Sequence, residues 1–139
     1  MGLLSFFRKS TRAAATPYDA IGGEPAVGRL ANRFYDIMST DPLVAELYAM
    51  HPQPLDRIRY VFTQYLAMWL GGPDDYVTER GHPRLRARHL PFAITPVLKE
   101  QWMYCMRKAM HETVRDRQLA NRLLQALDQL ADHMVNTDA

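Results

Sequence analysis

In the stretch Gly81-His82-Pro83-Arg84-Leu85-Arg86-Ala87-Arg88-His89-Leu90-Pro91-Phe92, two histidines, two prolines and three arginines fall within twelve residues. Because proline lacks a backbone donor, Pro83 and Pro91 limit any helix here to a short one. That helix would begin near Pro83 and end just past His89, since the residue before a proline avoids the helical region. His89 would then lie on its last turn. Two interpretations remain open: a histidine that ligates a buried cofactor with an anionic rim, or a basic loop that holds a hydrogen-bonded histidine.

The whole chain has the size and composition of one globular domain. It has 139 residues, of which 47% are hydrophobic, enough for a single core. The 17 basic and 15 acidic residues nearly balance, at a net charge of +2, which argues against a nucleic-acid partner. Cys105 is the only cysteine, which excludes an internal disulfide and a multi-cysteine zinc site. No apolar run reaches the length of a transmembrane helix.

Residues 1–16 are expected to form a flexible N-terminal extension, and residues 17–139 the folded domain. Chain ends are commonly poorly ordered unless other segments hold them. In this extension the mostly apolar residues 3–7 precede the basic ones, which reverses the order of a secretory signal. Weak contact of the extension with a membrane surface is the alternative. A cytoplasmic location is therefore expected.

Apolar residues recur at spacings of three and four along most of the chain, which is typical of amphipathic helices. Short helical pieces are expected just before the glycine pair Gly22-Gly23 and near residues 43–47. Residues 74–80 are expected to form a polar connection with one buried side chain, that of Tyr76. The period predicts four long helices, over residues 25–38, 55–70, 96–114 and 118–134. The predicted fold class is therefore all-α.

The motifs of common enzymes and metal sites are absent from the sequence. It has no His-Glu-x-x-His motif and no phosphate-binding glycine loop. Cys105 lies on an apolar helical stripe and is expected in the core. A proline separates His82 from His89, which argues against a metal site made of these two histidines. His111 and His133 are expected at the surface.

Porphyrin binding is the cofactor chemistry that remains for His89. Haem needs a flat apolar slot, an imidazole for the iron and cations for two propionates. The helical stripes carry aromatic side chains that could line such a slot or form a plain core: Phe34, Phe62, Tyr65, Trp69, Phe92 and Trp102. These residues permit haem binding without requiring it.

Five motifs, in this order and spacing, resemble those of the group II truncated haemoglobins. They are Tyr18-Asp19-Ala20-Ile21-Gly22-Gly23, Arg33-Phe34-Tyr35, Gly71-Gly72-Pro73, the stretch Gly81–Ile94, and Trp102 with Cys105-Met106. The resemblance covers nearly all of residues 18–136, and Gly81–Ile94 is its most specific part. It implies a truncated globin domain over residues 17–139, folded as a two-over-two helical sandwich around a haem.

The resemblance implies that His89 is the proximal ligand of the iron of haem b. Its second ring nitrogen is expected to donate to a backbone carbonyl, which would fix the ring. Arg86 or Arg88 would pair with a haem propionate, because guanidinium groups suit carboxylates. The residues expected to bind the cofactor are Phe62, Tyr76, Arg86, Arg88, His89, Phe92 and Trp102.

By the same resemblance, Tyr35 and Trp102 would donate hydrogen bonds to a ligand on the distal side of the haem. His51 is the expected third polar residue there, with Tyr48 as the competing assignment. Whether Tyr35 or His51 binds the iron itself is left open.

Two further distal residues, Ile58 and Phe62, are bulky and apolar. At the first of these positions many relatives carry Ala, Ser or Thr. Ile58 and Phe62 are expected to narrow the path by which a ligand enters.

The resemblance further implies reversible binding of dioxygen and of other diatomic gases such as nitric oxide and carbon monoxide. Each charge-assisted hydrogen bond contributes roughly 1.5–3 kcal/mol, so two donors predict slow oxygen release. Slow release favours ligand chemistry or sensing over oxygen transport. Turnover of nitric oxide, peroxide or related reactive species, as a nitric oxide dioxygenase or a peroxidase-like enzyme, would need an external electron donor.

Two alternatives belong to other classes of protein. One is a haem-based redox enzyme, which requires the same iron, pocket and donors. The other is a haem-free helical interaction module that uses the basic segment 84–88 and the apolar N-terminal residues as contacts. A homodimer is also compatible with the sequence.

Overall fold

The computed structural model describes residues 16–138, and every regular element in this range is helical. The predicted all-α class is therefore confirmed. The predicted extension lies outside the described residues except for Thr16. The hydroxyl of Thr16 accepts a hydrogen bond from the backbone of Asp19 at 3.1 Å and caps the first described helix.

Gly22 separates the first two helices, α2 (Pro17–Ile21) and α3 (Gly23–Thr40). Its φ of +117° lies in the left-handed region, which glycine adopts without strain. The break at the glycine pair is where the sequence predicted it. The long helix α3 begins two residues before Pro25, because a proline is tolerated within the first turn of a helix.

Gly72 brings α2 close to the end of α5 (Asp56–Trp69). A side chain at position 72 would place its Cβ 2.4 Å from the ring of Tyr18. The backbone N–H of Tyr18 also donates to the carbonyl of Leu70 at 2.9 Å. Two of the motifs that carried the resemblance therefore meet in space.

Two short helical segments, η1 (Pro42–Val44) and α4 (Ala45–Ala49), connect α3 to α5, as the sequence predicted for this corner. Asp41 joins the corner to helix α8 (Pro96–Thr113). One carboxylate oxygen of Asp41 accepts from the backbone of Leu43 at 3.0 Å, and the other from the Tyr104 hydroxyl of α8 at 2.6 Å.

Residues 74–80, predicted as a polar connection, form the helix α6 (Asp75–Arg80). Tyr76 is 4% exposed, as predicted, and its ring lies 5.7 Å from that of Tyr65. The guanidinium of Arg80 lies 5.6 Å from the centre of the Tyr76 ring. Of the two apolar residues of this helix only Tyr76 is buried, while Val77 is 40% exposed, and two adjacent apolar residues give no helical period in the sequence.

The basic segment forms one short helix, α7 (Leu85–His89), between Pro83 and Pro91, as predicted. Arg84, immediately before it, has a φ of +46°, which is uncommon for a residue other than glycine.

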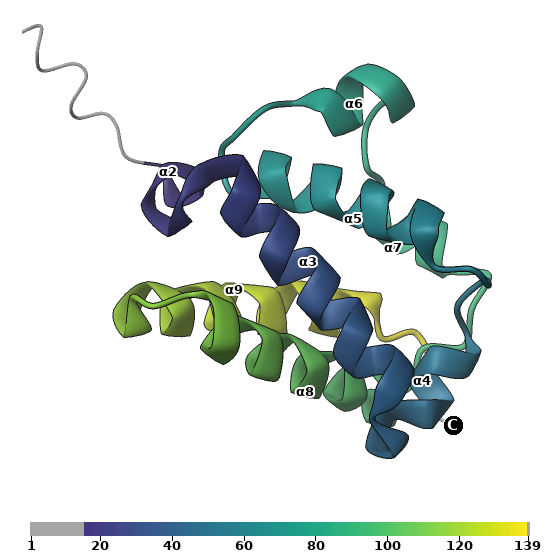
Figure 1. The fold of residues 1–139 in the computed structure, drawn as a ribbon. Helices are drawn as coiled ribbons and strands as arrows, with labels where there is room; N and C mark the ends of the chain where they lie inside the picture. The colour runs from purple at the N-terminus through teal and green to yellow at the C-terminus, as the bar shows by residue number, and fades with distance from the viewer. Residues whose placement is uncertain (1–15, 139) are drawn as a thin grey trace, which may run out of the picture.

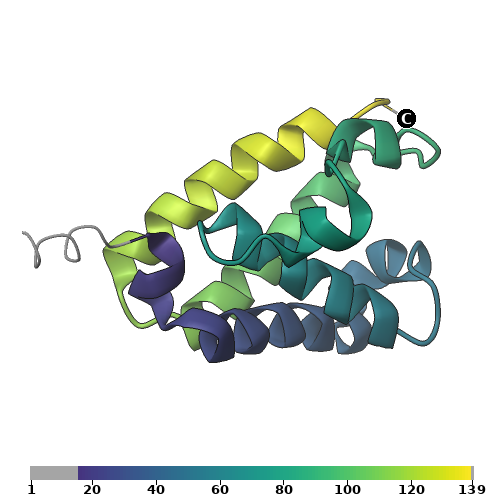
Figure 2. The same cartoon turned by 90° about the horizontal axis from the view of Figure 1, so that it is seen from above.

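The long helices form two layers (Figures 1 and 2). The helix α3 packs against α5 and α8, and α8 packs against α9 (Arg117–Met134). In Figure 1, α5 lies above α8 and α9, while α6 lies outside both layers. This arrangement is the predicted two-over-two helical sandwich.

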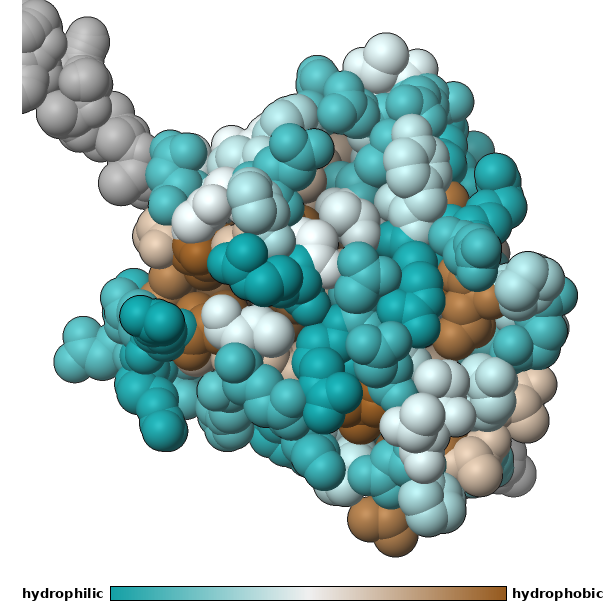
Figure 3. Space-filling model, in the orientation of Figure 1, coloured by the Kyte–Doolittle hydropathy of each residue, from teal (hydrophilic) through white to brown (hydrophobic). Residues whose placement is uncertain are grey.

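The core lies where these four helices meet. Cys105 is buried, as predicted, and His111 and His133 are exposed. Figure 3 shows that the face of Figure 1 is mostly hydrophilic, with small apolar areas. Among residues 16–138, no helix is long and apolar enough to span a membrane. The largest fully buried side chains include those of Phe34, Leu30, Met38, Leu66, Met106 and Leu127.

Candidate functional site

A cavity of about 720 Å³ lies between the helical layers. This volume falls within the range of cofactor and small-molecule pockets. Its wall includes almost all of the residues that the sequence suggested for a haem site: Tyr35, His51, Ile58, Phe62, Tyr76, Arg88, His89, Phe92 and Trp102. Residues as distant in sequence as those of α3 and α8 therefore meet at one site.

His89, on the last turn of α7, has the geometry of a metal-ligating histidine. Its Nδ1 lies 2.7 Å from the carbonyl oxygen of Leu85. A carbonyl only accepts, so Nδ1 carries the proton and Nε2 keeps its lone pair. This is the tautomer of a histidine that binds a metal through Nε2, with its second nitrogen held by the protein.

His82 has the opposite arrangement. Its Nδ1 accepts a hydrogen bond from the backbone N–H of Arg84 at 3.0 Å. The residue is exposed and lies outside the cavity wall. Of the two histidines in the basic segment, the structure therefore brings only His89 to the cavity.

Tyr35 and Trp102 supply two hydrogen-bond donors to the cavity wall. Tyr35 is 3% exposed, and burial raises the pKa of its hydroxyl, which is therefore protonated at neutral pH. Neither the Tyr35 hydroxyl nor the Trp102 indole N–H has a hydrogen-bond partner within residues 16–138. Trp102 is half-buried, whereas Tyr35 is buried. Buried polar groups usually have partners, so the free hydroxyl of Tyr35 indicates a site that is completed by a ligand.

An aromatic cluster fixes the directions of these side chains. The ring of Phe34, which is 0% exposed, lies 4.9 Å from Tyr35, 5.2 Å from Phe62 and 5.1 Å from Trp102, measured between ring centres. Two of these contacts are edge-to-face, a favourable geometry for aromatic pairs. Phe34 thus holds both donors and one apolar wall residue without lining the cavity itself.

The corner before α5 contributes His51 to the cavity. Its Nδ1 lies 2.9 Å from the carbonyl oxygen of Leu47, and its ring meets that of Tyr35 edge-to-face at 6.0 Å. Burial lowers the pKa of His51, which favours the neutral ring. Tyr48 donates instead to the side chain of Gln53 at 3.0 Å and lies outside the cavity wall.

Cations at the cavity include more residues than the sequence suggested. Arg57, Arg80 and Lys99 line it together with Arg88. Arg80 follows Tyr76 by one turn of α6, but the sequence predicted no helix there, so this spacing became meaningful only in the structure. Nothing in the local pattern indicates that Arg57 and Lys99 face the same cavity.

The two arginines of α7 point to different partners. Arg88 lines the cavity, and its Nε donates to the carbonyl of Pro83 at 2.6 Å. Arg86 lies outside the wall, where it donates to the carbonyls of His133 and Val135. Of these two candidate propionate partners, only Arg88 is close to the cavity.

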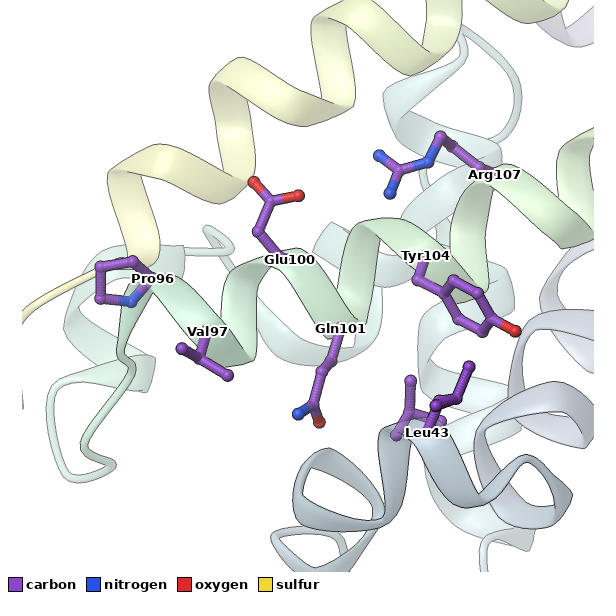
Figure 4. Close-up of a pocket in the computed structure, with 8 residues that line it drawn as sticks. Leu43, Pro96, Val97, Glu100, Gln101, Tyr104 and Arg107 are labelled. Carbon is purple, nitrogen blue, oxygen red and sulfur yellow. The ribbon is translucent and has the colours of Figure 1, made fainter.

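A second hollow of about 440 Å³ lies on the outer side of α8. Figure 4 shows Gln101 and Tyr104 extending from α8 toward the segment that carries Leu43. No histidine or cysteine lines this hollow. In the described part of the chain, no group of three or more histidine, cysteine or carboxylate side chains could hold a metal ion directly.

A two-layer helical fold around an apolar cavity, whose wall includes His89 and His51, each with Nδ1 on a backbone carbonyl, defines the class of two-over-two globins. The chain belongs to the bacterial-like globin family, whose model matches residues 16–136. Members of this class hold haem, so family membership implies haem as the cofactor. The resemblance noted from the motifs is thereby confirmed.

The similarity extends over almost the whole length of three bacterial relatives. The chain is 38% identical to the group 2 truncated hemoglobin YjbI of Bacillus subtilis, over 86% of this chain and 88% of the relative. A solved structure of a cold-adapted truncated hemoglobin from Pseudoalteromonas haloplanktis superposes with a TM-score of 0.87 at 53% identity, covering 88% of this chain and 99% of the other. A group II two-on-two hemoglobin from Agrobacterium tumefaciens gives a TM-score of 0.86 at 40% identity, with coverages of 89% and 96%.

Proposed function

We propose that the protein holds haem b through His89 and reversibly binds dioxygen and other diatomic ligands, such as nitric oxide and carbon monoxide. The observation that carries this proposal is the pairing of a histidine free at Nε2 with two unpartnered donors in one apolar cavity. Haem supplies an iron that has one coordination position open to a diatomic ligand. The residues of this chain decide how the cofactor is held and how the ligand is stabilised.

On the proximal side, the Leu85 carbonyl orients the His89 ring and raises the basicity of its free nitrogen. The guanidinium of Arg88 would pair with a haem propionate, and Arg57 and Arg80 are further cations at the cavity. Phe62, Tyr76, Phe92 and Trp102 would contact the porphyrin as apolar walls. Their apolar surfaces would keep water from the metal.

On the distal side, the hydroxyl of Tyr35 and the indole N–H of Trp102 would donate to a bound diatomic ligand. Dioxygen gains partial negative charge when it binds, so both donations favour the bound state. His51, held neutral by burial, would act as the third polar residue, in preference to Tyr48. Ile58 and Phe62 would narrow the entry path.

Slow release of oxygen follows from two donors at one site. This expectation agrees with a relative of known structure, a truncated oxygen-avid haemoglobin from Bacillus subtilis, which is 38% identical over 88% of this chain. A protein that releases oxygen slowly suits ligand chemistry better than transport. The second candidate function is therefore turnover of nitric oxide or peroxide, with electrons from a separate reductant.

A turnover assay separates simple binding from catalysis. Purified haem-loaded protein would be mixed with nitric oxide or peroxide in the presence of a physiological reductant. Consumption well above that of free haem supports the second candidate, and a rate equal to that of free haem excludes it.

The first test of the proposal is an absorption spectrum after haem addition. A Soret band with a single-histidine spectrum is expected, and its absence would favour the haem-free interaction module. His89→Ala should lose haem affinity, whereas His82→Ala, the matched control from the same segment, should keep it. Equal haem binding by both variants would contradict the axial assignment.

Cellular location and oligomeric state remain predictions, namely a cytoplasmic protein that is able to form a homodimer. Light scattering coupled to size-exclusion chromatography measures the mass in solution. A monomeric mass across a wide concentration range would contradict the homodimer.

A further inference from the structure

The segment that follows α9 is bound to the segment that follows α7. At the centre of this contact is Asn136, whose side-chain amide has three hydrogen-bond partners. Its Nδ2 donates to the carbonyls of His89 at 3.3 Å and Phe92 at 2.9 Å, and its Oδ1 accepts from the backbone of Ile94 at 2.9 Å. The backbone N–H of Asn136 also donates to the carbonyl of Ile94 at 3.0 Å.

The three partners of Asn136 share one property. His89, Phe92 and Ile94 all line the large cavity. One side chain, 42 to 47 residues away in sequence, therefore fixes the backbone of three cavity-lining residues, including that of the histidine. Asn136 itself lies outside the cavity wall and touches the site only through these residues.

The helix α7 needs such external support. It has only five residues, and helices of this length are not stable alone. Its last carbonyls have no partner within the helix, which is the general condition of helix ends. The carbonyl of His89 accepts from the backbone N–H of Phe92 at 2.9 Å, and the amide of Asn136 adds a second donor at 3.3 Å, which ties this end of α7 to the segment after α9.

Arg86 supports the same contact from the opposite direction. Its guanidinium donates to the carbonyls of His133 and Val135 at the end of α9. Both sides of this contact therefore contribute a side chain: Arg86 belongs to α7, and Asn136 lies two residues after the end of α9.

We propose that Asn136 is a positioning residue for the haem site, which sets the position of the proximal histidine through the backbone of residues 89–94. This inference rests on the proposed haem ligation by His89. The amide restricts tilting and translation of α7, and the Nε2 of His89 moves with that helix. Loss of the amide would leave His89 attached to α7 but let the helix shift relative to the cavity.

Two variants and a control test this role in the full chain. Asn136→Ala removes all three side-chain hydrogen bonds. Asn136→Asp keeps the shape of the side chain but turns both donations into repulsion between oxygen atoms. Asn121→Ala is the matched control, because Asn121 is an exposed asparagine of α9 whose side chain has no hydrogen-bond partner in the described part of the chain.

Two measurements are made on each haem-loaded protein. The rate of haem transfer to an excess of a haem-binding acceptor should rise about tenfold in both Asn136 variants, the scale expected when two or more neutral hydrogen bonds are lost. The iron–histidine stretching band of the ferrous, ligand-free protein should shift or broaden in both variants. Asn121→Ala should match the unchanged protein in both measurements.

The results separate positioning from plain stability and from failure of the underlying proposal. An unchanged iron–histidine band in both Asn136 variants overturns the inference, even where their thermal stability falls. A band that changes in Asn136→Ala but not in Asn136→Asp also overturns it, because side-chain volume and not hydrogen-bond donation would then be the cause. If the unchanged protein shows no Soret band, the proposed function fails first, and the inference fails with it.

Discussion

Replacement of Tyr35 by phenylalanine should change stability and ligand release in ways that no ordinary core tyrosine would. The Tyr35 hydroxyl is buried and has no partner within residues 16–138. Removal of this oxygen from the haem-free protein therefore breaks no hydrogen bond. The substitution should leave the free energy of unfolding unchanged or raise it.

The expected increase in the free energy of unfolding is at most the cost of burying a hydroxyl without a partner, about 1–3 kcal/mol in proteins. The gain approaches zero where water enters the empty cavity and hydrates the hydroxyl. In the ligand-bound protein the sign reverses, since the donation contributes roughly 1.5–3 kcal/mol. Oxygen dissociation should then become faster by about ten- to a hundredfold.

Tyr104→Phe is the matched control. The Tyr104 hydroxyl donates to a carboxylate oxygen of Asp41 at 2.6 Å, outside the large cavity. Its removal should lower the free energy of unfolding and leave the oxygen dissociation rate unchanged. Urea denaturation of the haem-free proteins measures the first quantity, and stopped-flow displacement of oxygen by carbon monoxide measures the second.

The reasoning would be refuted if Tyr35→Phe destabilised the haem-free protein as much as Tyr104→Phe does. That outcome would mean that the Tyr35 hydroxyl has a partner in the protein. Unchanged oxygen dissociation in Tyr35→Phe would separately remove its role as a distal donor.

Two further predictions concern ion pairs and pH. Lys99 has an 8% exposed side chain and contacts Asp128 at 2.6 Å and Asp132 at 3.1 Å. Asp128→Asn and Asp132→Asn should each lower the free energy of unfolding by at most about 1 kcal/mol, since both carboxylates are well exposed. In urea denaturation, the double variant should lose more than the sum of the two single losses. Strict additivity would show that the two carboxylates do not share Lys99. The pKa of Asp41 is lowered, and the largest cause is the hydrogen bond from Tyr104. The ionised Asp41 therefore stabilises the fold above the pKa of an unfolded aspartate, about 3.9, and this stabilisation is lost as pH falls through the lower pKa of the folded state. Tyr104→Phe should reduce this loss in a series of denaturation curves below pH about 4, and an identical acid dependence would contradict the cause assigned to the shift.

The predicted site residues that line the cavity belong to motifs with a strong local signature. The two prolines around α7 fixed the length of that helix, and the placement of His89 on its last turn put Nδ1 within reach of the carbonyl of Leu85. Tyr35 and Trp102 came from the resemblance, and both lie in the cavity wall.

The site residues that sequence reasoning missed depend on side-chain direction and on distant contacts. Arg86 and Arg88 are two positions apart on one short helix and therefore point to different sides. Which of them meets the cavity depends on how α7 packs against α9. The same holds for Lys99, for which the sequence predicted no role and which α9 places beside Asp128 and Asp132.

The sequence by itself determined the all-α class, the positions of the long helices and the short helix that carries His89. These features are local: the spacing of apolar residues identifies a helix, and prolines and glycines limit its ends through the backbone of their immediate neighbours. Only the tertiary structure decided that His51 rather than Tyr48 faces the cavity and that Asn136 holds the backbone of residues 89–94. Such choices depend on contacts between residues that lie far apart in the chain, and no local pattern encodes which partners the packed helices bring together.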